Sequence, residues 1–76
     1  MKKSEFLAAF EDILQTEGEI EENQKLEDLD EWDSLSKMAT MAYFQQTFGI
    51  ELTLNYLKDI KTPSDLIKLA GDKIND

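Results

Sequence analysis

The stretch Glu31-Trp32-Asp33-Ser34-Leu35 marks the point at which this 76-residue chain changes character. Residues 1–33 contain three lysines and twelve acidic residues, whereas residues 34–76 contain five of each, so the whole net charge of −9 precedes Ser34. Aspartate is a favoured N-cap because its carboxylate accepts a hydrogen bond from a backbone N–H of the first turn, here that of Leu35 or Ser36. Asp33 is therefore predicted to open a helix.

The residues after Ser34 carry apolar side chains at helical spacing. They form two adjoining rows, which are Leu35, Met38 and Ala42 in one and Met41, Phe44 and Phe48 in the other. A face this wide is expected for the central helix of a bundle, with Met38 and Met41 in the core. Gly49 is predicted to end the helix. Ser34 is expected to be exposed, because Leu35 begins the apolar row.

An amphipathic helix is predicted near the N-terminus of the chain. Ser4 is a suitable N-cap, Phe6 and Phe10 are followed at helical spacing by Ile13, and Gly18 is a suitable stop. These signals together predict a first helix whose apolar stripe faces the core.

The segment between the first two helices is too polar for a packed element. We predict a long loop over residues 18–33, held to the core by the isolated side chains of Ile20, Leu26 and Leu29. A loop of this length is uncommon in a small domain and is often functional. Its acidic residues have two readings, a solvated surface that keeps the protein soluble or a docking surface beside a reactive site.

The chain after Gly49 predicts a short helix and then a longer one. Thr53 can cap the short helix, which runs through Ile60. Thr62-Pro63-Ser64-Asp65 combines an N-cap, a proline at the first helical position and an acid at the third. The last helix continues to Ile74, with fraying at Gly71. With no alternating strand pattern, we predict an all-α fold, a four-helix bundle of three longer helices and a short third, in one domain over residues 1–76.

The composition excludes several classes of function. The chain has no cysteine and no histidine, which removes disulfides, zinc clusters and histidine-based catalysis. No apolar run approaches the roughly 20 residues of a membrane span, and the acidity disfavours nucleic acid and anionic lipid. We expect a cytoplasmic monomer without enzymatic activity, whose partners have basic docking surfaces.

A calcium site in the loop was considered because Asp28 and Asp30 have the initial spacing of an EF-hand. Such a loop needs glycine at its sixth position and glutamate at its twelfth. Those positions hold Asp33 and Ala39, so no metal site is predicted.

Ser34 has a plain reading and a functional one. Serine and aspartate are common at helix starts, so the tripeptide Asp33-Ser34-Leu35 alone indicates little more than a helix start. At such a start the backbone N–H groups point outward and favour an anion, so a phosphodiester on the Ser34 oxygen would be stabilised. The hydroxyl would then serve as an attachment point and not as a catalytic nucleophile.

The order of motifs along the chain resembles that of acyl carrier proteins, in the phosphopantetheine-binding carrier family. The resemblance is carried by Asp33-Ser34-Leu35, by Phe48-Gly49-Ile50-Glu51-Leu52 and by Lys61-Thr62-Pro63-Ser64-Asp65-Leu66, within the predicted helix plan. It implies a bundle of the acyl-carrier type, in which Ser34 receives 4′-phosphopantetheine from coenzyme A. The transfer would be made by a separate phosphopantetheinyl transferase with magnesium, and Asp33 would be the motif neighbour.

The resemblance also implies the partners of the chain. The thiol of the arm would carry an acyl or aminoacyl group as a thioester, received from a loading ligase and passed to acyl-accepting enzymes. The protein would thus be a shuttle and not a catalyst. The alternative is a small acidic helical adaptor with no prosthetic group, in which Ser34 is a plain helix-start residue.

Two departures from the family pattern suggest a particular role. Glu31-Trp32 replaces the usual glycine-containing pair, and residues 34–50 contain no acid where carriers of fatty acid synthesis present several. We therefore expect a carrier for a dedicated pathway. The docking residues are predicted to lie around the attachment site, and they are Glu27, Asp28, Asp30, Glu31, Trp32 and Leu35. For Trp32 the alternatives are packing over the loop and anchoring a partner.

Overall fold

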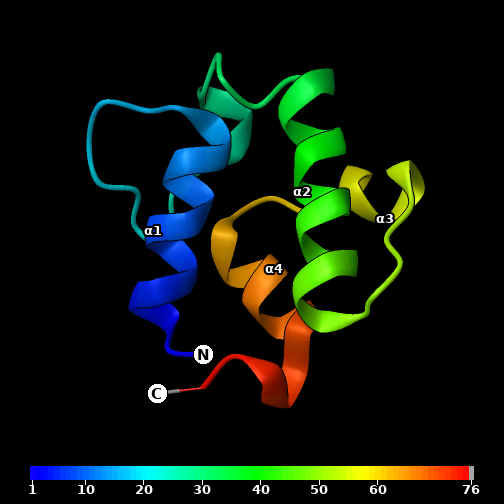
Figure 1. Ribbon diagram of the computed structural model, residues 1–76. Helices are drawn as coiled ribbons and strands as arrows, with labels where there is room; N and C mark the ends of the chain where they lie inside the picture. The colour runs from blue at the N-terminus through cyan, green and yellow to red at the C-terminus, as the bar shows by residue number, and fades with distance from the viewer. Residues whose placement is uncertain (76) are drawn as a thin grey trace.

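The computed structural model describes residues 1–75, and the regular elements over that range are all helices joined by loops (Figure 1). The elements in chain order are α1 (Lys3–Leu14), η1 (Leu26–Asp28), α2 (Ser34–Phe48), α3 (Leu54–Lys58), α4 (Pro63–Ala70) and η2 (Gly71–Lys73), where η denotes a short 3₁₀-helix. The predicted all-α fold with three longer helices and a short third one is confirmed. None of the helices formed by the described residues has the length and apolar character needed to cross a bilayer.

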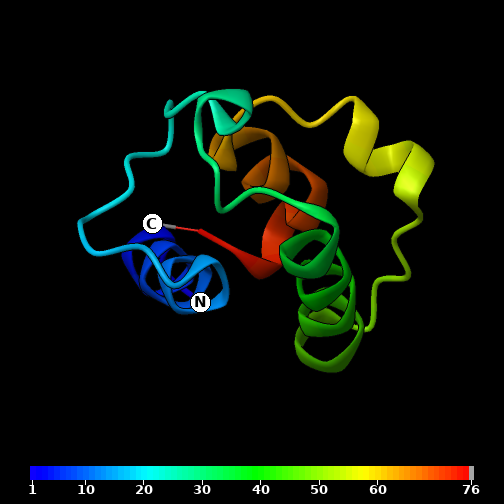
Figure 2. The ribbon, with the colours of Figure 1, turned by 90° about the horizontal axis from the view of Figure 1, so that it is seen from above.

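The three longer helices surround one core, and α3 lies outside them. Helix α1 contacts both α2 and α4, while α3 lies on the side of α2 that is turned away from α1 (Figures 1 and 2). The centre of the core is aromatic. The ring centroids of Phe6 and Phe44 are 5.9 Å apart, and those of Phe44 and Phe48 are 5.1 Å apart, both in edge-on geometry that favours aromatic pairs.

Helix α1 begins and ends earlier than the sequence predicted. Lys2 is the N-cap, and its backbone N–H donates to Glu5 Oε1 at 2.9 Å, so the predicted Ser4 cap is wrong. At the other end Gln15 adopts a left-handed conformation with φ of 59° and donates to the Glu11 carbonyl at 2.7 Å. The helix therefore ends at Leu14, and the predicted stop at Gly18 is also wrong.

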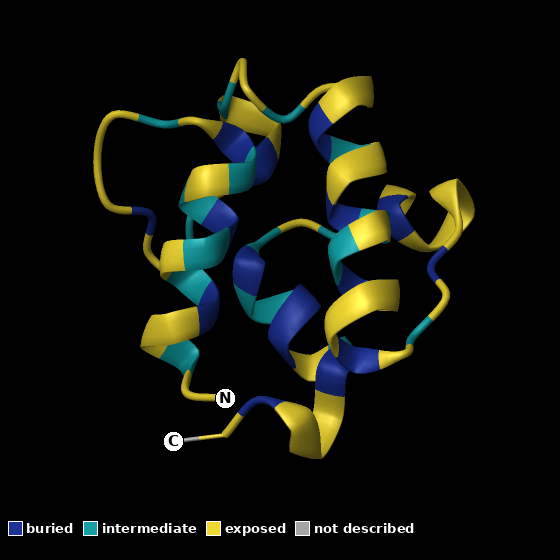
Figure 3. Ribbon diagram, in the orientation of Figure 1, coloured by how far each residue is buried: buried dark blue, intermediate teal, exposed yellow. Residues whose placement is uncertain are grey.

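The buried face of α2 differs from the predicted one. Its buried residues are Ser36, Thr40, Phe44 and Phe48, whereas Leu35 is 78% exposed and Met38 is 59% exposed. The predicted row that starts at Leu35 is thus wrong, as is the core position of Met38, while Met41 is half-buried. Figure 3 shows the buried side of α2 turned toward α1 and α4.

Two hydroxyl groups can replace apolar side chains on this face because both have hydrogen-bond partners. Thr40 Oγ1 donates to the Ser36 carbonyl at 2.8 Å, and Ser36 Oγ donates to the Asp33 carbonyl at 3.0 Å. A buried polar group with partners costs little compared with an unpaired one. Phe44 and Phe48 therefore determine which face of α2 is turned to the core, and Ser36 and Thr40 can be buried on that face.

The loop between α1 and α2 is held to the core as predicted. Ile20 and Leu26 are buried and Leu29 is half-buried. Backbone bonds add to this attachment, because the Leu26 N–H donates to the Lys61 carbonyl at 2.9 Å and the Ser64 N–H donates to the Glu22 carbonyl at 2.8 Å. The loop thus runs along the start of α4 and brings the chain back to the beginning of α2.

The third and fourth helices start where the sequence predicted. The Tyr56 N–H donates to Thr53 Oγ1 at 3.3 Å at the start of α3, and Asp65 Oδ2 accepts the Thr62 N–H at 3.3 Å at the start of α4. Their ends come earlier than predicted. Helix α3 ends at Lys58 and α4 at Ala70, because Gly71 takes φ of +62° and begins η2.

Candidate functional site

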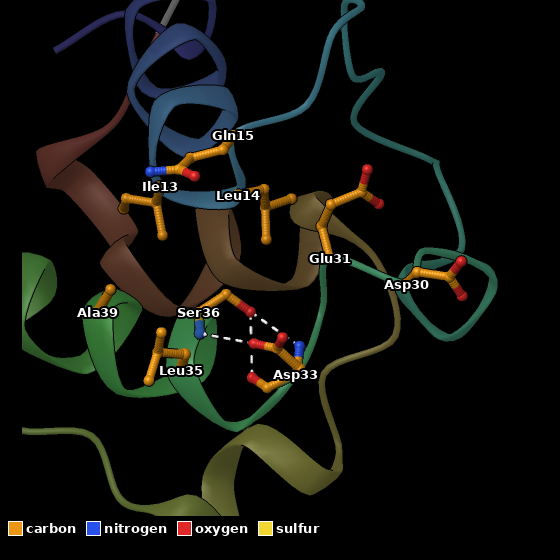
Figure 4. A pocket seen from close by; sticks show the side chains of 9 residues that line it. All are labelled: Ile13, Leu14, Gln15, Asp30, Glu31, Asp33, Leu35, Ser36 and Ala39. Carbon is orange, nitrogen blue, oxygen red and sulfur yellow. Dashed lines mark hydrogen bonds between the residues drawn. The ribbon is translucent and has the colours of Figure 1, made fainter.

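Asp33 and Ser36 form a reciprocal cap at the start of α2. Asp33 Oδ1 accepts the Ser36 N–H at 3.0 Å, and the Asp33 N–H donates to Ser36 Oγ at 2.9 Å (Figure 4). The Ser36 hydroxyl in turn donates to the Asp33 carbonyl. The predicted cap by Asp33 is confirmed. Because both residues are fixed to each other, Ser34 and Leu35 between them have a defined backbone.

The Asp33 carboxyl is held in its charged form. Its pKa is lowered from the ordinary value of 3.8, chiefly by the hydrogen bond from the backbone N–H of Ser36. Desolvation is the next largest effect and raises the pKa, while contacts with the Ser36 side chain and the Leu35 N–H lower it further. A carboxylate at this position also complements the positive end of the α2 dipole.

Ser34 is the first residue of α2, and its side chain is exposed, as predicted. The predicted reason is wrong, since Leu35 is exposed as well. Within residues 1–75 no hydrogen bond occupies the Ser34 hydroxyl. The side chain borders a groove of about 260 Å³ between α2 and α3, whose other lining residues are Lys37, Met38, Leu54 and Lys58. A free hydroxyl at the edge of a groove lined by two lysines fits a phosphate ester.

A larger cavity lies on the other side of the start of α2. Its volume is about 520 Å³, and it opens between the end of α1 and the first turns of α2 (Figure 4). Its acidic lining residues are Asp30, Glu31 and Asp33, and its apolar ones are Ile13, Leu14, Leu35 and Ala39. Three of the predicted docking residues, Asp30, Glu31 and Leu35, are thus brought together, and all three are exposed.

The remaining predicted docking residues lie elsewhere. Glu27 and Asp28 belong to η1 and are exposed. Glu27 lines a third cavity, of about 320 Å³, which also contains Trp32 and the lysines Lys37, Lys58 and Lys61. The predicted acidic docking set is therefore divided between the two sides of the α2 start.

Trp32 is half-buried and packs on the core, which matches the first of its two alternative roles. Its ring lies edge-on to that of Phe10, with centroids 5.7 Å apart. Lys37 Nζ lies over the other part of the ring, 5.7 Å from the centroid, within range of a cation–π contact. The role of Trp32 as a partner anchor stays a prediction.

Three site residues were not identified from the sequence. Ser36 has a local signal, since Asp33 and Ser36 have the spacing of a capping box with serine in place of glutamate. Lys37 has only its spacing as a signal, since it lies three residues after Ser34 on the same helix. Lys58 has no local signal, because it belongs to α3 and only the packing of α3 beside α2 brings it to Ser34.

The described residues contain no cluster of three or more acidic side chains arranged to hold a metal ion. Comparison with curated proteins gives no significant match, and comparison with solved structures gives none either. A family model described as "Phosphopantetheine attachment site" matches residues 4–70, which include α2, α3, α4 and nearly all of α1. The chain therefore belongs to the phosphopantetheine-binding carrier family, whose members hold 4′-phosphopantetheine on a serine and are non-catalytic carriers.

Proposed function

We propose that Ser34 is the residue that receives 4′-phosphopantetheine, and that the chain carries acyl or aminoacyl groups in a dedicated pathway. The observation that carries the proposal is the free, exposed hydroxyl of Ser34 at the first turn of α2, inside the matched region. The other serines fit less well. Ser36 is buried and hydrogen-bonded, while Ser4 and Ser64 belong to α1 and α4, away from the Asp-Ser-Leu motif.

The residues of this chain would act by presenting the hydroxyl. In the transfer, Ser34 Oγ forms a bond to phosphorus while the pyrophosphate bond of coenzyme A breaks, adenosine 3′,5′-bisphosphate leaves and the hydroxyl proton is released. The outward N–H groups of the first turn favour the phosphate charge that remains on the protein. The bound group supplies a thiol at the end of a long arm, and the chain itself contains no cysteine that could compete for the cargo.

The role in a dedicated pathway is supported by the outer face of α2. Residues 34–50 contain no acid, and the exposed residues of this face include Leu35, Met38, Gln45 and Gln46. An enzyme that recognises a row of carboxylates along α2 would find none to bind. Partners are instead expected to contact Asp30 and Glu31 beside Ser34, together with the neutral face.

The attachment is tested by intact mass spectrometry. The protein is incubated with a broad-specificity phosphopantetheinyl transferase, magnesium and coenzyme A, and wild type is expected to gain the mass of one phosphopantetheine. Ser34→Ala should gain nothing, whereas Ser4→Ala, which also removes an exposed serine near a helix start, should gain the same mass as wild type.

Peptide mapping completes this test, because the chain has no arginine and trypsin cuts only after lysine. Residues 26–37 form one tryptic peptide that contains both Ser34 and Ser36. Fragmentation of this peptide must place the added mass on Ser34. An equal mass gain in Ser34→Ala, or no gain in wild type, would refute the assignment.

A further inference from the structure

The groove beside Ser34 is positively charged in a chain whose net charge is −9. Its lining contains two lysines, Lys37 and Lys58, and no acidic residue. The other two cavities differ in this respect, since one contains three carboxylates and the other contains Glu27. The cavity with no carboxylate of its own is thus the one that Ser34 lines.

Within the described residues 1–75, the two lysines form no ion pair. The ion pair found within residues 1–75 joins Lys3 and Glu22, with N and O 3.9 Å apart. Among the residues that the structure describes, no carboxylate oxygen lies within the 4.0 Å of an ion pair from Lys37 or Lys58. Their ammonium groups are therefore available to an anion that enters the groove.

The fold aims both lysines at the same place. Ser34 and Lys37 are three residues apart on α2, so their side chains lie on the same face of the helix. Lys58 is the last residue of α3 and approaches the groove from the other wall. Lys37 Nζ also lies 5.7 Å from the centroid of the Trp32 ring, which lines the neighbouring cavity, but an ammonium has three donors, so this contact leaves it able to bind an anion.

We propose that Lys37 and Lys58 bind the phosphodiester of the arm on Ser34 and hold the base of the arm in the groove between α2 and α3. The proposal rests on the attachment to Ser34 proposed above. The apolar walls of the groove support it, because Met38 is 59% exposed and Leu54 is 55% exposed there and both can contact the arm beyond its phosphate. The arm would then leave Ser34 along α3 and not toward the acidic loop.

Nuclear magnetic resonance of the loaded protein tests this directly. The side-chain signals of all lysines are compared before and after the arm is attached. We expect the signals of Lys37 and Lys58 to shift on attachment, and those of Lys68 and Lys73, which line none of the three cavities, to stay in place.

Matched variants provide the second readout, the ³¹P relaxation of the arm's phosphodiester. In the loaded double variant Lys37→Gln/Lys58→Gln we expect slower transverse relaxation, because the phosphate moves more freely. Loss of two exposed ion pairs lowers the ratio of bound to free phosphate about two- to thirtyfold. High salt should have the same effect on wild type. Lys68→Gln/Lys73→Gln removes the same charge and should relax like wild type.

The outcomes separate this proposal from the proposed function. A chain that gains no arm at Ser34 refutes both. A chain that is loaded at Ser34, but whose Lys37 and Lys58 signals do not respond, refutes only the binding of the phosphate. The same conclusion follows if the two double variants change the ³¹P relaxation equally, since the effect would then come from net charge.

Discussion

Replacement of Ser36 by alanine separates the structural cap from the attachment site. Ser36 Oγ accepts the Asp33 N–H at 2.9 Å and donates to the Asp33 carbonyl at 3.0 Å, and Ser36 is only 6% exposed. Two hydrogen bonds contribute about 1–3 kcal/mol to the free energy of unfolding. The Asp33 N–H also donates to the Glu31 carbonyl at 3.1 Å, so part of this contribution remains in the variant.

Alanine recovers a further part of the loss, because it favours the helix by roughly 0.5 kcal/mol over serine. Ser36→Ala is therefore expected to lower the free energy of unfolding by about 0.5–1.5 kcal/mol, measured as a lower urea midpoint with an unchanged slope. For a domain of this size that corresponds to a melting temperature lower by about 4–8 °C per kcal/mol.

The rate of arm attachment is the readout that distinguishes positioning from stability. Loss of the reciprocal cap loosens the first turn of α2, so the transferase rate on Ser36→Ala should fall by up to about tenfold, the ratio that 1.4 kcal/mol represents. Thr40→Val is the matched control, because it removes the buried bond from Thr40 Oγ1 to the Ser36 carbonyl without touching the cap. If Thr40→Val slowed attachment as much, or if Ser36→Ala were loaded at the wild-type rate, the positioning role would be disproved.

Three further predictions concern charge and packing. The pKa of Asp33 is lowered in the folded state, so its stabilising effect is fully present above pH 3.8 and is lost as pH falls through the lower folded value. Asp33→Asn should remove this pH-dependent part of the free energy of unfolding, measured by urea titrations in acid. Identical pH profiles for the variant and wild type would contradict the stabilising role of Asp33. Neutralising the four predicted docking acids, Glu27, Asp28, Asp30 and Glu31, should raise the transferase KM, whereas neutralising the exposed Asp12, Glu17, Glu19 and Glu21 should not. Phe44→Ala should lower the free energy of unfolding by about 3–5 kcal/mol, and Met38→Ala by about 0.5 kcal/mol or less. Similar losses in the two variants would show that Met38 is buried, as the sequence predicted.

The starts of α2, α3 and α4 could be predicted because their signals are local. Asp33, Thr53 and Thr62-Pro63 each satisfy N–H groups within three residues, and Gly49 ends α2 with φ of 69°. Such a signal does not depend on where the rest of the chain lies. The start of α1 was missed because Glu5 Oε1 accepts the Lys2 N–H, so the helix begins at Lys3 and Ser4 lies inside it.

The buried face of α2 could not be read from the helix alone. Apolar residues occur on both sides of α2, so periodicity allowed Leu35 and Met38 to face the core. The choice is made by the packing against the other helices, in which Phe44 meets Phe6 of α1 and lies beside Phe48 of its own helix. Once that ring is in place, Ser36 and Thr40 must turn inward, and exposed Leu35 and Met38 become surface beside Ser34.

The groove at Ser34 could not be predicted for a similar reason, since Lys58 reaches it only through the packing of α3. Its electrostatics give one physical cause for the lack of acids on α2 and for the lysine at position 37. A unit charge about 6 Å from a phosphate interacts by about 0.7 kcal/mol in water and about 3 kcal/mol at an effective dielectric constant of 20. The sign is favourable for Lys37 and would be unfavourable for an acid at the same position. A carrier that holds the phosphate against α2 therefore gains from lysine at position 37, and would lose by placing carboxylates on that face. Acidic docking residues are then restricted to the loop before Ser34, which is where the excess of acids lies.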